Sequence, residues 1–430
     1  MSQEALSFIV FIVGMLTLMG IGMSMALALV LTGAAMAWTL DFWDTQLLAQ
    51  NLVAGVDSFP LLAVPFFILA GELMNSGGIS RRIIDMAQAW VGHIRGGLGF
   101  VTIAAAILMA SMSGSALADT AALATILLPM MRKQGYPMNT SAGLVASGGI
   151  IAPIIPPSMP FVIYGVTTNT SISLLFLSGI VPGLIMAIGL IIAWKVELRR
   201  IDLPEGKPQP MRQRIQTSVK AFWAMLMPVI IIGGMKTGIF TPTEAAVVAA
   251  FYALVIALFI HREMKVVEIY EVLLRAAKTT GIVMFLCAGA QVASYMITLA
   301  DLPGVLINWL GPLVESPRFL VAVMMVAQVM IGMVLDLTPT ILIFAPVMLP
   351  IAVKAGVDPV YFGLMFVLNG SIGLITPPVG TVLNVIAGVG KMPIHHVIRG
   401  VSPFLITYLC ILVLFVVFPQ IVTAPVAWMR

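Results

Sequence analysis

The residues best suited to chemistry in this chain are two proline pairs, Pro156-Pro157 and Pro377-Pro378, each of which interrupts a long apolar stretch. Proline has no backbone N–H and clashes with the preceding helical turn. Each pair is therefore expected to free backbone carbonyls before a break and to start a second half-helix after it. Freed carbonyls suit a hard cation, and the N-terminus of a half-helix suits a carboxylate. The breaks predict neighbouring sites for a cation and an organic acid; a structural kink is the alternative for either break alone.

Two polar segments inside apolar runs repeat a second pattern. Residues 111–115 (SMSGS) precede Asp119, and residues 335–339 (LDLTP) contain Asp336. A carboxylate at the bilayer centre costs about 2.5 to 3.5 kcal/mol, which argues for function, although a helix cap or a proton relay is an alternative for each. The available donors are hard oxygens, which favour one Na+ per half, and the spacings do not separate Na+ from H+. The predicted ion ligands are Ser113, Gly114, Ser115, Asp119, Pro156, Asp336, Thr338, Thr340, Thr376 and Pro377; the predicted substrate contacts are Ser115, Ser158, Thr381 and Asn384.

The composition indicates a polytopic membrane protein. Hydrophobic residues make up 60% of the 430 residues, charged residues 9%, and the mean hydropathy is +1.08, whereas charged residues approach a quarter of a soluble domain. The net charge of +4 comes from dispersed basic residues without an aromatic groove, so nucleic-acid binding is not expected. The four His and two Cys lack the spacing of a metal site or a catalytic nucleophile, which argues against an enzyme.

The two breaks belong to two related halves. Position 377 minus position 156 gives an offset of 221, and the same offset carries residues 112–182 onto 333–403 without a gap. We predict an all-α membrane protein with a repeat at 1–198 and another at 242–430. Residues 199–241 are expected to form a cytoplasmic linker, a short interfacial helix and a connecting span.

Apolar windows and breakers predict at least nine crossings. Each of two further stretches, 98–131 and 319–353, has two apolar arms of about 14 residues, which reach only about 21 Å and predict re-entrant helical hairpins. A cytoplasmic N-terminus places all 22 Lys and Arg on the inner side except Lys236, Arg318, Lys354 and Arg430. The hairpins then enter from opposite faces, as in an inverted-topology repeat with two broken helices. The predicted crossings lie at 6–38, which is one bent helix or two, and at 59–76, 143–169, 172–198, 222–236, 242–260, 276–300, 360–390 and 402–425.

Several motifs resemble those of the large membrane subunit of TRAP (tripartite ATP-independent periplasmic) transporters. They are residues 58–66 (SFPLLAVPF), 71–78 (GELMNSGG), 112–119 (MSGSALAD) and 241–244 (TPTE), together with the two proline pairs. The resemblance runs from about residue 5 to 425. Around 149–160 and 374–390 the chain is most similar to the branch that includes the 2,3-diketo-L-gulonate transporter.

The resemblance implies a Na+-coupled importer of the ion-transporter superfamily that works by an elevator mechanism in the bacterial inner membrane, with two or more Na+ ions. It also implies a small four-helix membrane subunit and a periplasmic solute-binding protein that delivers an organic anion, such as a C4-dicarboxylate or a sugar acid. A stand-alone dicarboxylate symporter of the same superfamily is the alternative within transport. A non-transporting membrane scaffold or an intramembrane enzyme is the alternative outside it.

Overall fold

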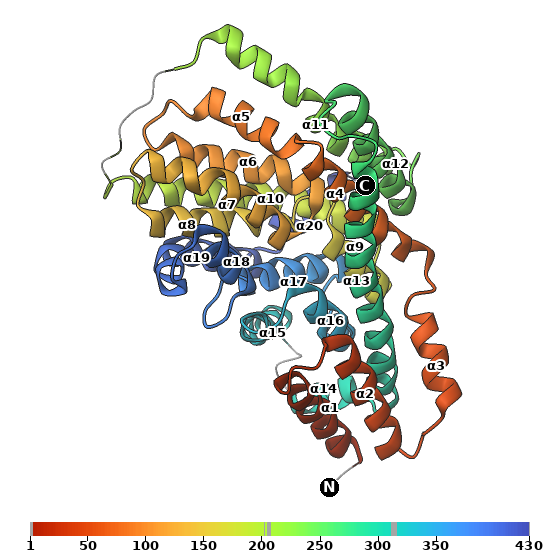
Figure 1. Ribbon diagram of the computed structural model, residues 1–430. Coiled ribbons are helices and arrows are strands. Elements are labelled where there is room, and N and C mark those ends of the chain that lie inside the picture. The colour runs from red at the N-terminus through yellow and green to blue at the C-terminus, as the bar shows by residue number, and fades with distance from the viewer. Residues whose placement is uncertain (1–2, 202, 204–207, 311–315, 430) are drawn as a thin grey trace.

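All regular elements in the described residues, which are 3–201, 203, 208–310 and 316–429 of this computed structural model, are helical (Figure 1). The first half contains α1 (Gln3–Gly20), α2 (Met25–Thr39), α3 (Thr45–Ala54), the 3-10 turn η1 (Phe59–Leu62), α4 (Ala63–Ser76), α5 (Ile79–Val91), α6 (Gly97–Ser113), α7 (Ala116–Lys133), α8 (Met138–Gly149), α9 (Met159–Thr168) and α10 (Ile172–Glu197). The second half contains α11 (Met211–Lys236), α12 (Pro242–Val255), the π-helical turn η2 (Ile256–Ile260), α13 (Glu268–Leu299), α14 (Leu302–Leu310), α15 (Pro317–Gly332), α16 (Leu337–Lys354), α17 (Pro359–Gly373), α18 (Thr381–Gly390), α19 (Ile394–Val417) and α20 (Gln420–Met429).

Helices of the two halves pack reciprocally. In each half two consecutive helices pack on each other, α6 with α7 and α15 with α16, and each pair packs on the next helix, α8 or α17. Across the halves, α7 packs on α18 and α16 on α9, while α8 packs on α19 and α17 on α10. The first helices behave in the same way, because α2 packs on α13 and α12 on α4. The halves therefore interleave around one shared core.

Close backbone approach holds one of these cross-half contacts. A Cβ atom on Gly143 of α8 would lie only 2.1 Å from the carbonyl O of Gly400 in α19, so both positions require glycine. The hydroxyl of Tyr408 also donates to the Ser147 carbonyl O at 2.7 Å, inside the same contact. Small residues at a helix contact combined with an interhelical hydrogen bond are typical of helix association in membranes.

Seven helices in the described part of the chain are long and apolar enough to cross a membrane. Six of them correspond to predicted crossings, and the seventh is α16, which was predicted as a hairpin arm. The other three predicted crossings are each split into two shorter helices. The window 6–38 divides into α1 and α2, 143–169 into α8 and α9, and 360–390 into α17 and α18. The last two divisions fall at the proline pairs.

The arms of the helix pairs are longer than predicted. They contain 17 and 18 residues in α6 and α7, and 16 and 18 in α15 and α16. The prediction of about 14 residues was wrong because helical structure continues through Ser113 at one end and Lys133 at the other. At about 1.5 Å per residue an 18-residue arm reaches about 27 Å, so arm length alone does not identify a hairpin.

The segment that joins the halves also differs from the prediction. We expected a short interfacial helix and then a separate span over 222–236, but α11 is one helix of 26 residues. It contains Pro228 without a break, and its first turns lie on α5, where the Trp90 indole N–H donates to Ser218 Oγ at 2.9 Å.

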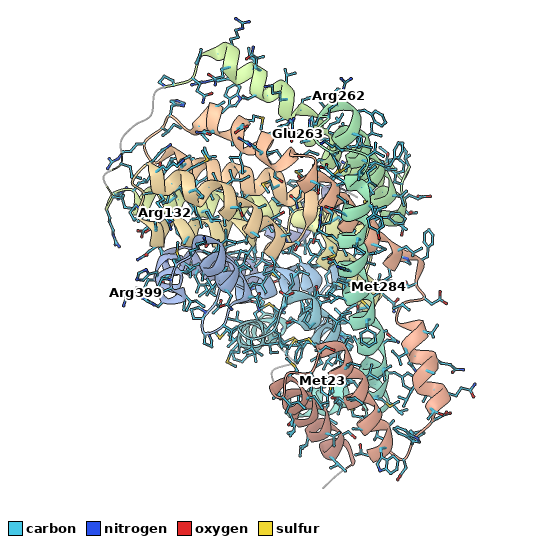
Figure 2. The ribbon with its side chains drawn as sticks, in the orientation of Figure 1. Met23, Arg132, Arg262, Glu263, Met284 and Arg399 are labelled. Carbon is cyan, nitrogen blue, oxygen red and sulfur yellow. The ribbon has the colours of Figure 1, made fainter. Side chains whose placement is uncertain are left out.

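Basic residues gather at the ends of the helix layers. Figure 2 shows Arg132, near the C-terminus of α7, and Arg399, near the start of α19, at the same end of these layers. The Arg132 guanidinium donates to the carbonyl O of Gly390, the last residue of α18, at 3.1 Å. A cation at a helix C-terminus is favourable because the last carbonyls there have no helical partners.

Candidate functional site

The turn between α6 and α7 contacts the first break directly. Gly114 has a φ of +60° at this turn, and a Cβ atom there would lie 2.9 Å from the Met159 backbone N and 3.0 Å from the Pro157 carbonyl O. Ser115 caps the N-terminus of α7 by accepting the Ala118 N–H at 3.4 Å. Glycine is needed at the turn for its left-handed backbone and for this close approach.

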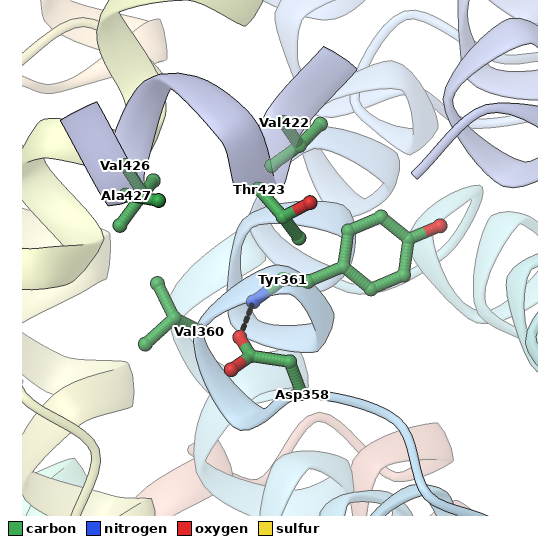
Figure 3. Close-up of a pocket in the computed structure, with 7 residues that line it drawn as sticks. All are labelled: Asp358, Val360, Tyr361, Val422, Thr423, Val426 and Ala427. Carbon is green, nitrogen blue, oxygen red and sulfur yellow. Dashed lines mark hydrogen bonds between the residues drawn. The ribbon is translucent and has the colours of Figure 1, made fainter. Parts of the chain in front are cut away.

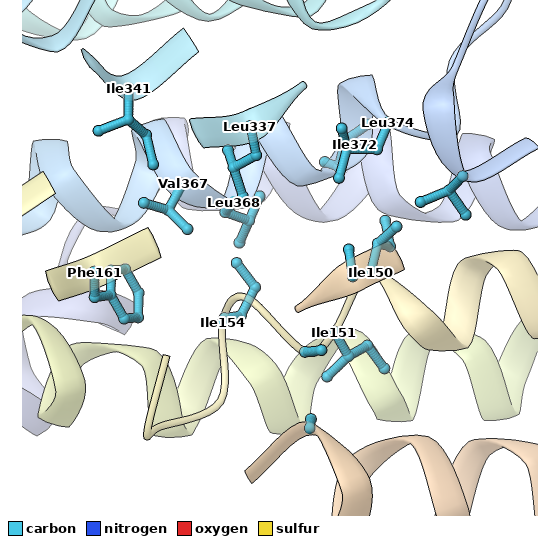
Figure 4. Close-up of a cluster of buried hydrophobic side chains, with 14 of the residues drawn as sticks. Ile150, Ile151, Ile154, Phe161, Leu337, Ile341, Val367, Leu368, Ile372 and Leu374 are labelled. Carbon is cyan, nitrogen blue, oxygen red and sulfur yellow. The ribbon is translucent and has the colours of Figure 1, made fainter. Parts of the chain in front are cut away.

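The first break is a buried loop. Helix α8 ends at Gly149, α9 starts at Met159 after the N-cap Ser158, and the Ser158 hydroxyl donates to the Pro153 carbonyl O at 2.5 Å. Apolar side chains fill the space around this loop. Figure 4 shows Ile150 and Ile154 facing the second half, while Ile151 lies on the opposite side of the loop; the facing residues are Leu337 and Ile341 of α16, Val367, Leu368 and Ile372 of α17, and Leu374 directly after it. The second half therefore seals the break of the first.

The turn between α15 and α16 contacts the second break in the same way. The Gly380 N–H donates to the Met333 carbonyl O at 3.1 Å, and Thr381, the first residue of α18, lies beside the Asp336 carboxylate. Pro378 and Val379 are exposed here, whereas Pro157 and Ser158 are buried in the first half.

The acidic residue lies at a different position in each of the two return helices, α7 and α16. Ser115 and Asp336 are the N-caps of α7 and α16 and correspond under the offset of 221. One helical turn further, Asp119 corresponds to Thr340. Residues four apart lie on the same helix face, so each return helix presents one carboxylate and one hydroxyl there, with their order exchanged. Asp119 is 2% exposed, while Asp336 is half-buried.

Two hydroxyl groups near the second break donate their protons to backbone carbonyls. Thr340 Oγ1 donates to the Asp336 carbonyl O and Thr376 Oγ1 donates to the Ile372 carbonyl O, both at 2.8 Å. A hydroxyl that gives its proton to a carbonyl still offers its lone pairs. The Asp336 carboxylate, these hydroxyls and the carbonyls of the break all offer hard oxygens, the donor type that an alkali cation prefers. The residues present therefore fit Na+.

Several predicted residues lie elsewhere or serve another purpose. Thr338 is half-buried and Pro377 borders the exposed side of the second break. Asn384 is exposed on α18, with its amide 3.4 Å from the Val379 carbonyl O. Ser158 closes its own loop, so its hydroxyl proton is not available to a substrate. Pro156 is buried in the same loop, and the side chain of Ser113 lies outside the described residues.

Three buried polar residues were missed by sequence reasoning. Thr120 is 0% exposed, follows Asp119, and lies against Gly149 at the end of α8. In the second half the Gln328 amide donates to the Phe366 carbonyl O at 2.6 Å, and the Asn369 amide donates to the Met325 carbonyl O at 2.7 Å. These bonds fasten α15 to α17. A lone Gln inside an apolar arm was the available signal, because an unpaired amide is costly in lipid.

Comparison with known proteins identifies the family. The model of the tripartite ATP-independent periplasmic transporter, DctM component, matches residues 8–421. The chain belongs to this DctM family. This permease is 53% identical over 410 residues to the 2,3-diketo-L-gulonate TRAP transporter large permease protein YiaN of Escherichia coli K12, a match that covers 95% of this chain and 96% of that protein. It is 39% identical over 382 residues to the C4-dicarboxylate TRAP transporter large permease protein DctM of Pseudomonas aeruginosa, with 89% and 90% covered.

A solved structure supports the fold of the DctM-family permease. The YdaH transporter of Alcanivorax borkumensis superposes with a TM-score of 0.65 over 86% of this chain and 87% of that one, at 15% sequence identity. The predicted resemblance to TRAP permeases is confirmed, and the permease is a multi-pass membrane transporter component rather than an enzyme.

Proposed function

We propose that this permease imports a small organic anion by Na+-coupled secondary transport, with substrate and ions held where the two helix-pair turns meet the two breaks. The observation that carries the proposal is the repeated contact of turn and break in the two halves, Gly114 against Met159 and Met333 against Gly380, in which Met159 and Gly380 are 221 positions apart. Broken helices at corresponding places in two halves are the usual position of the substrate and ion sites in secondary transporters.

We further propose that α6–α7 and α15–α16 are re-entrant hairpins that enter from opposite faces of the membrane. Support comes from the reciprocal packing of the halves, because α7 lies on α18 while α16 lies on α9. The basic end of α7 at Arg132 and Lys133 is then cytoplasmic, as is the N-terminus, and Lys354 at the end of α16 is periplasmic. Movement of this hairpin-bearing core against α2, α4, α12 and α13 would be an elevator transition.

The coupling ions are Na+ in this proposal, one in each half. In the second half the ligands are Asp336, Thr340, Thr376 and the carbonyls that precede Pro377. In the first half they are Ser115, Asp119 and the carbonyls of the loop before Pro156. Hard oxygen donors favour Na+ over a transition metal.

The transported acid is a sugar acid or a C4-dicarboxylate, delivered by a periplasmic binding protein together with a small membrane subunit. The names of the two relatives support this substrate class, and the tripartite family description supports the partners. The acid's carboxylate would face the N-terminus of α18, where Thr381 is partly exposed at the break.

Reconstituted uptake tests the proposal. The permease is placed in liposomes with the small subunit and the binding protein, and uptake of labelled 2,3-diketo-L-gulonate or succinate is measured with an inward Na+ gradient and with K+ in its place. Uptake should require Na+ and both partners. Equal uptake in K+ would reject Na+ coupling, and full uptake by the permease alone would favour a stand-alone symporter.

A further inference from the structure

An apolar groove runs between α15 and α19 on the second half. Its volume is about 450 Å³ and its walls are one face of each helix, from Ala322 on α15 to Met333 directly after that helix, and over 409–417 on α19. The wall residues recur every three or four positions, which is the spacing of a single helix face. The rims are open, since Val326 is 63% exposed and Val413 is 60% exposed.

Two smaller cavities continue the groove at its polar end. The first, of about 200 Å³, shares Val416 with the groove and is also lined by Arg318 and Asp358. The second, of about 210 Å³, shares Asp358 with the first and is shown in Figure 3, where Tyr361 and Thr423 border it from α17 and α20. The Asp358 carboxylate accepts the Tyr361 N–H at 2.8 Å as the N-cap of α17. An apolar channel thus leads to a site lined by one cation and one anion.

We propose that this groove binds a phospholipid with an ammonium head group, of the phosphatidylethanolamine class. One acyl chain lies between α15 and α19, the phosphate pairs with Arg318 and the ammonium pairs with Asp358. Charge complementarity selects this head group, because Asp358 opposes a purely anionic lipid while Arg318 opposes a purely cationic one.

The length of the groove agrees with an acyl chain in one leaflet. The eleven residue steps from Ala322 to Met333 rise about 17 Å at 1.5 Å per residue, and half of a hydrocarbon core is about 15 Å. Arg318 then lies at the membrane surface and the α15–α16 turn at the midplane. This placement rests on the re-entrant orientation proposed above. Because Met333 accepts the Gly380 N–H, the lipid would support the end of α15 that contacts the second break.

Native mass spectrometry of the purified permease tests the proposal. Delipidated protein is exposed to mixed micelles that contain phosphatidylethanolamine or phosphatidylglycerol, and retained lipid is counted. One phosphatidylethanolamine should be retained, and Val413→Phe, which fills the groove, should reduce its retention at least tenfold. Ile406→Phe is the matched control, because Ile406 is 61% exposed on the same helix and does not line the groove, so its retention should be unchanged.

Head-group variants complete the test. Arg318→Gln should weaken retention of both lipids, while Asp358→Asn, which preserves the helix cap, should weaken retention of phosphatidylethanolamine alone. Equal retention of the two lipids by the unmodified protein, unchanged retention in Val413→Phe, or a dimer mass that Val413→Phe abolishes would each overturn the proposal. Lipid counting is independent of uptake, so failure here leaves Na+-coupled transport standing, and loss of Na+ coupling leaves the bound lipid in place.

Discussion

The two breaks of this permease have the same sequence pattern and opposite surroundings. Around Pro156-Pro157 the loop is buried, Ser158 bonds to its own loop, and side chains of α16 and α17 fill the space (Figure 4). Around Pro377-Pro378 the loop reaches the surface, and Asn384 is exposed one turn into α18. Segments with the same sequence pattern therefore have different surroundings in this structure. We infer that the first break holds the core together while the second receives the solute.

The largest expected effect comes from removing each break. The double variants Pro156→Ala/Pro157→Ala and Pro377→Ala/Pro378→Ala should both lose uptake, because a continuous helix satisfies the carbonyls that the site needs free. The first variant should also unfold at a clearly lower temperature, since a straightened segment displaces buried side chains of the second half. Uptake in proteoliposomes and thermal unfolding in detergent measure the two effects.

Pro129→Ala is the control for these variants, because Pro129 lies inside α7 without breaking it. It should change uptake and unfolding only slightly. Strong uptake by either double variant would reduce that break to a structural kink. Equal loss of stability in both variants would contradict the comparison between a sealed and an open break.

Gly114→Ala should have the next largest effect. The left-handed backbone costs about 1 to 2 kcal/mol for a residue with a Cβ atom, and the new atom would press on the backbone of Met159 and Pro157. Gly135→Ala is the matched control, since Gly135 has a φ of +77° and no atom within 4 Å of its Cβ position. Gly114→Ala should lose more stability than the control and at least tenfold in uptake. Equal behaviour of the two variants would mean that the turn does not depend on contact with the break.

Much of this arrangement was predictable from the sequence because it depends on position along the chain. Proline pairs and polar turns mark where helices end, and a fixed offset identifies corresponding places. Asp336 and Thr381 were both predicted as site residues, and the structure places them side by side. Helix boundaries were less well predicted: α11 continues across the boundary expected at residue 222, and α13 and α19 begin eight residues before the predicted crossings at 276 and 402.

The difference between the breaks was not predictable, because it depends on which distant side chains cover each loop. Ser158 and Thr381 were both predicted to contact the substrate, yet one donates to a buried carbonyl and the other lies near an exposed loop. Likewise, the Gln328 and Asn369 bonds join α15 to α17 in the second half, where the corresponding positions of the first half are Ile107 and Gly148. The offset identifies corresponding residues, but it does not predict which side chains pack against them.

Neutralising the half-buried acid should have an intermediate effect that sharpens the role of the open break. Asp336→Asn should raise the Na+ concentration for half-maximal uptake by about tenfold or more, equivalent to about 1.4 kcal/mol. The reason is that an amide contributes no charge to a cation site. Asp301→Asn is the control. Asp301 lies between α13 and α14 and accepts the Gly304 N–H, and the side-chain oxygen of Asn can accept the same N–H. An unchanged Na+ dependence in Asp336→Asn would remove Asp336 from the ion site.

The smallest expected effects separate the two breaks most directly. Asn384→Ala should raise KM for the transported acid by about two- to tenfold with little change in unfolding temperature, because one hydrogen bond to substrate is worth about 0.5 to 1.5 kcal/mol. Ser158→Ala should instead lower the unfolding temperature and leave KM unchanged. It leaves the buried Pro153 carbonyl unpaired, at a cost of about 1 to 3 kcal/mol in stability. Uptake kinetics and thermal unfolding of both variants show at which break the acid binds. A raised KM in Ser158→Ala with normal stability would place the acid at the first break instead.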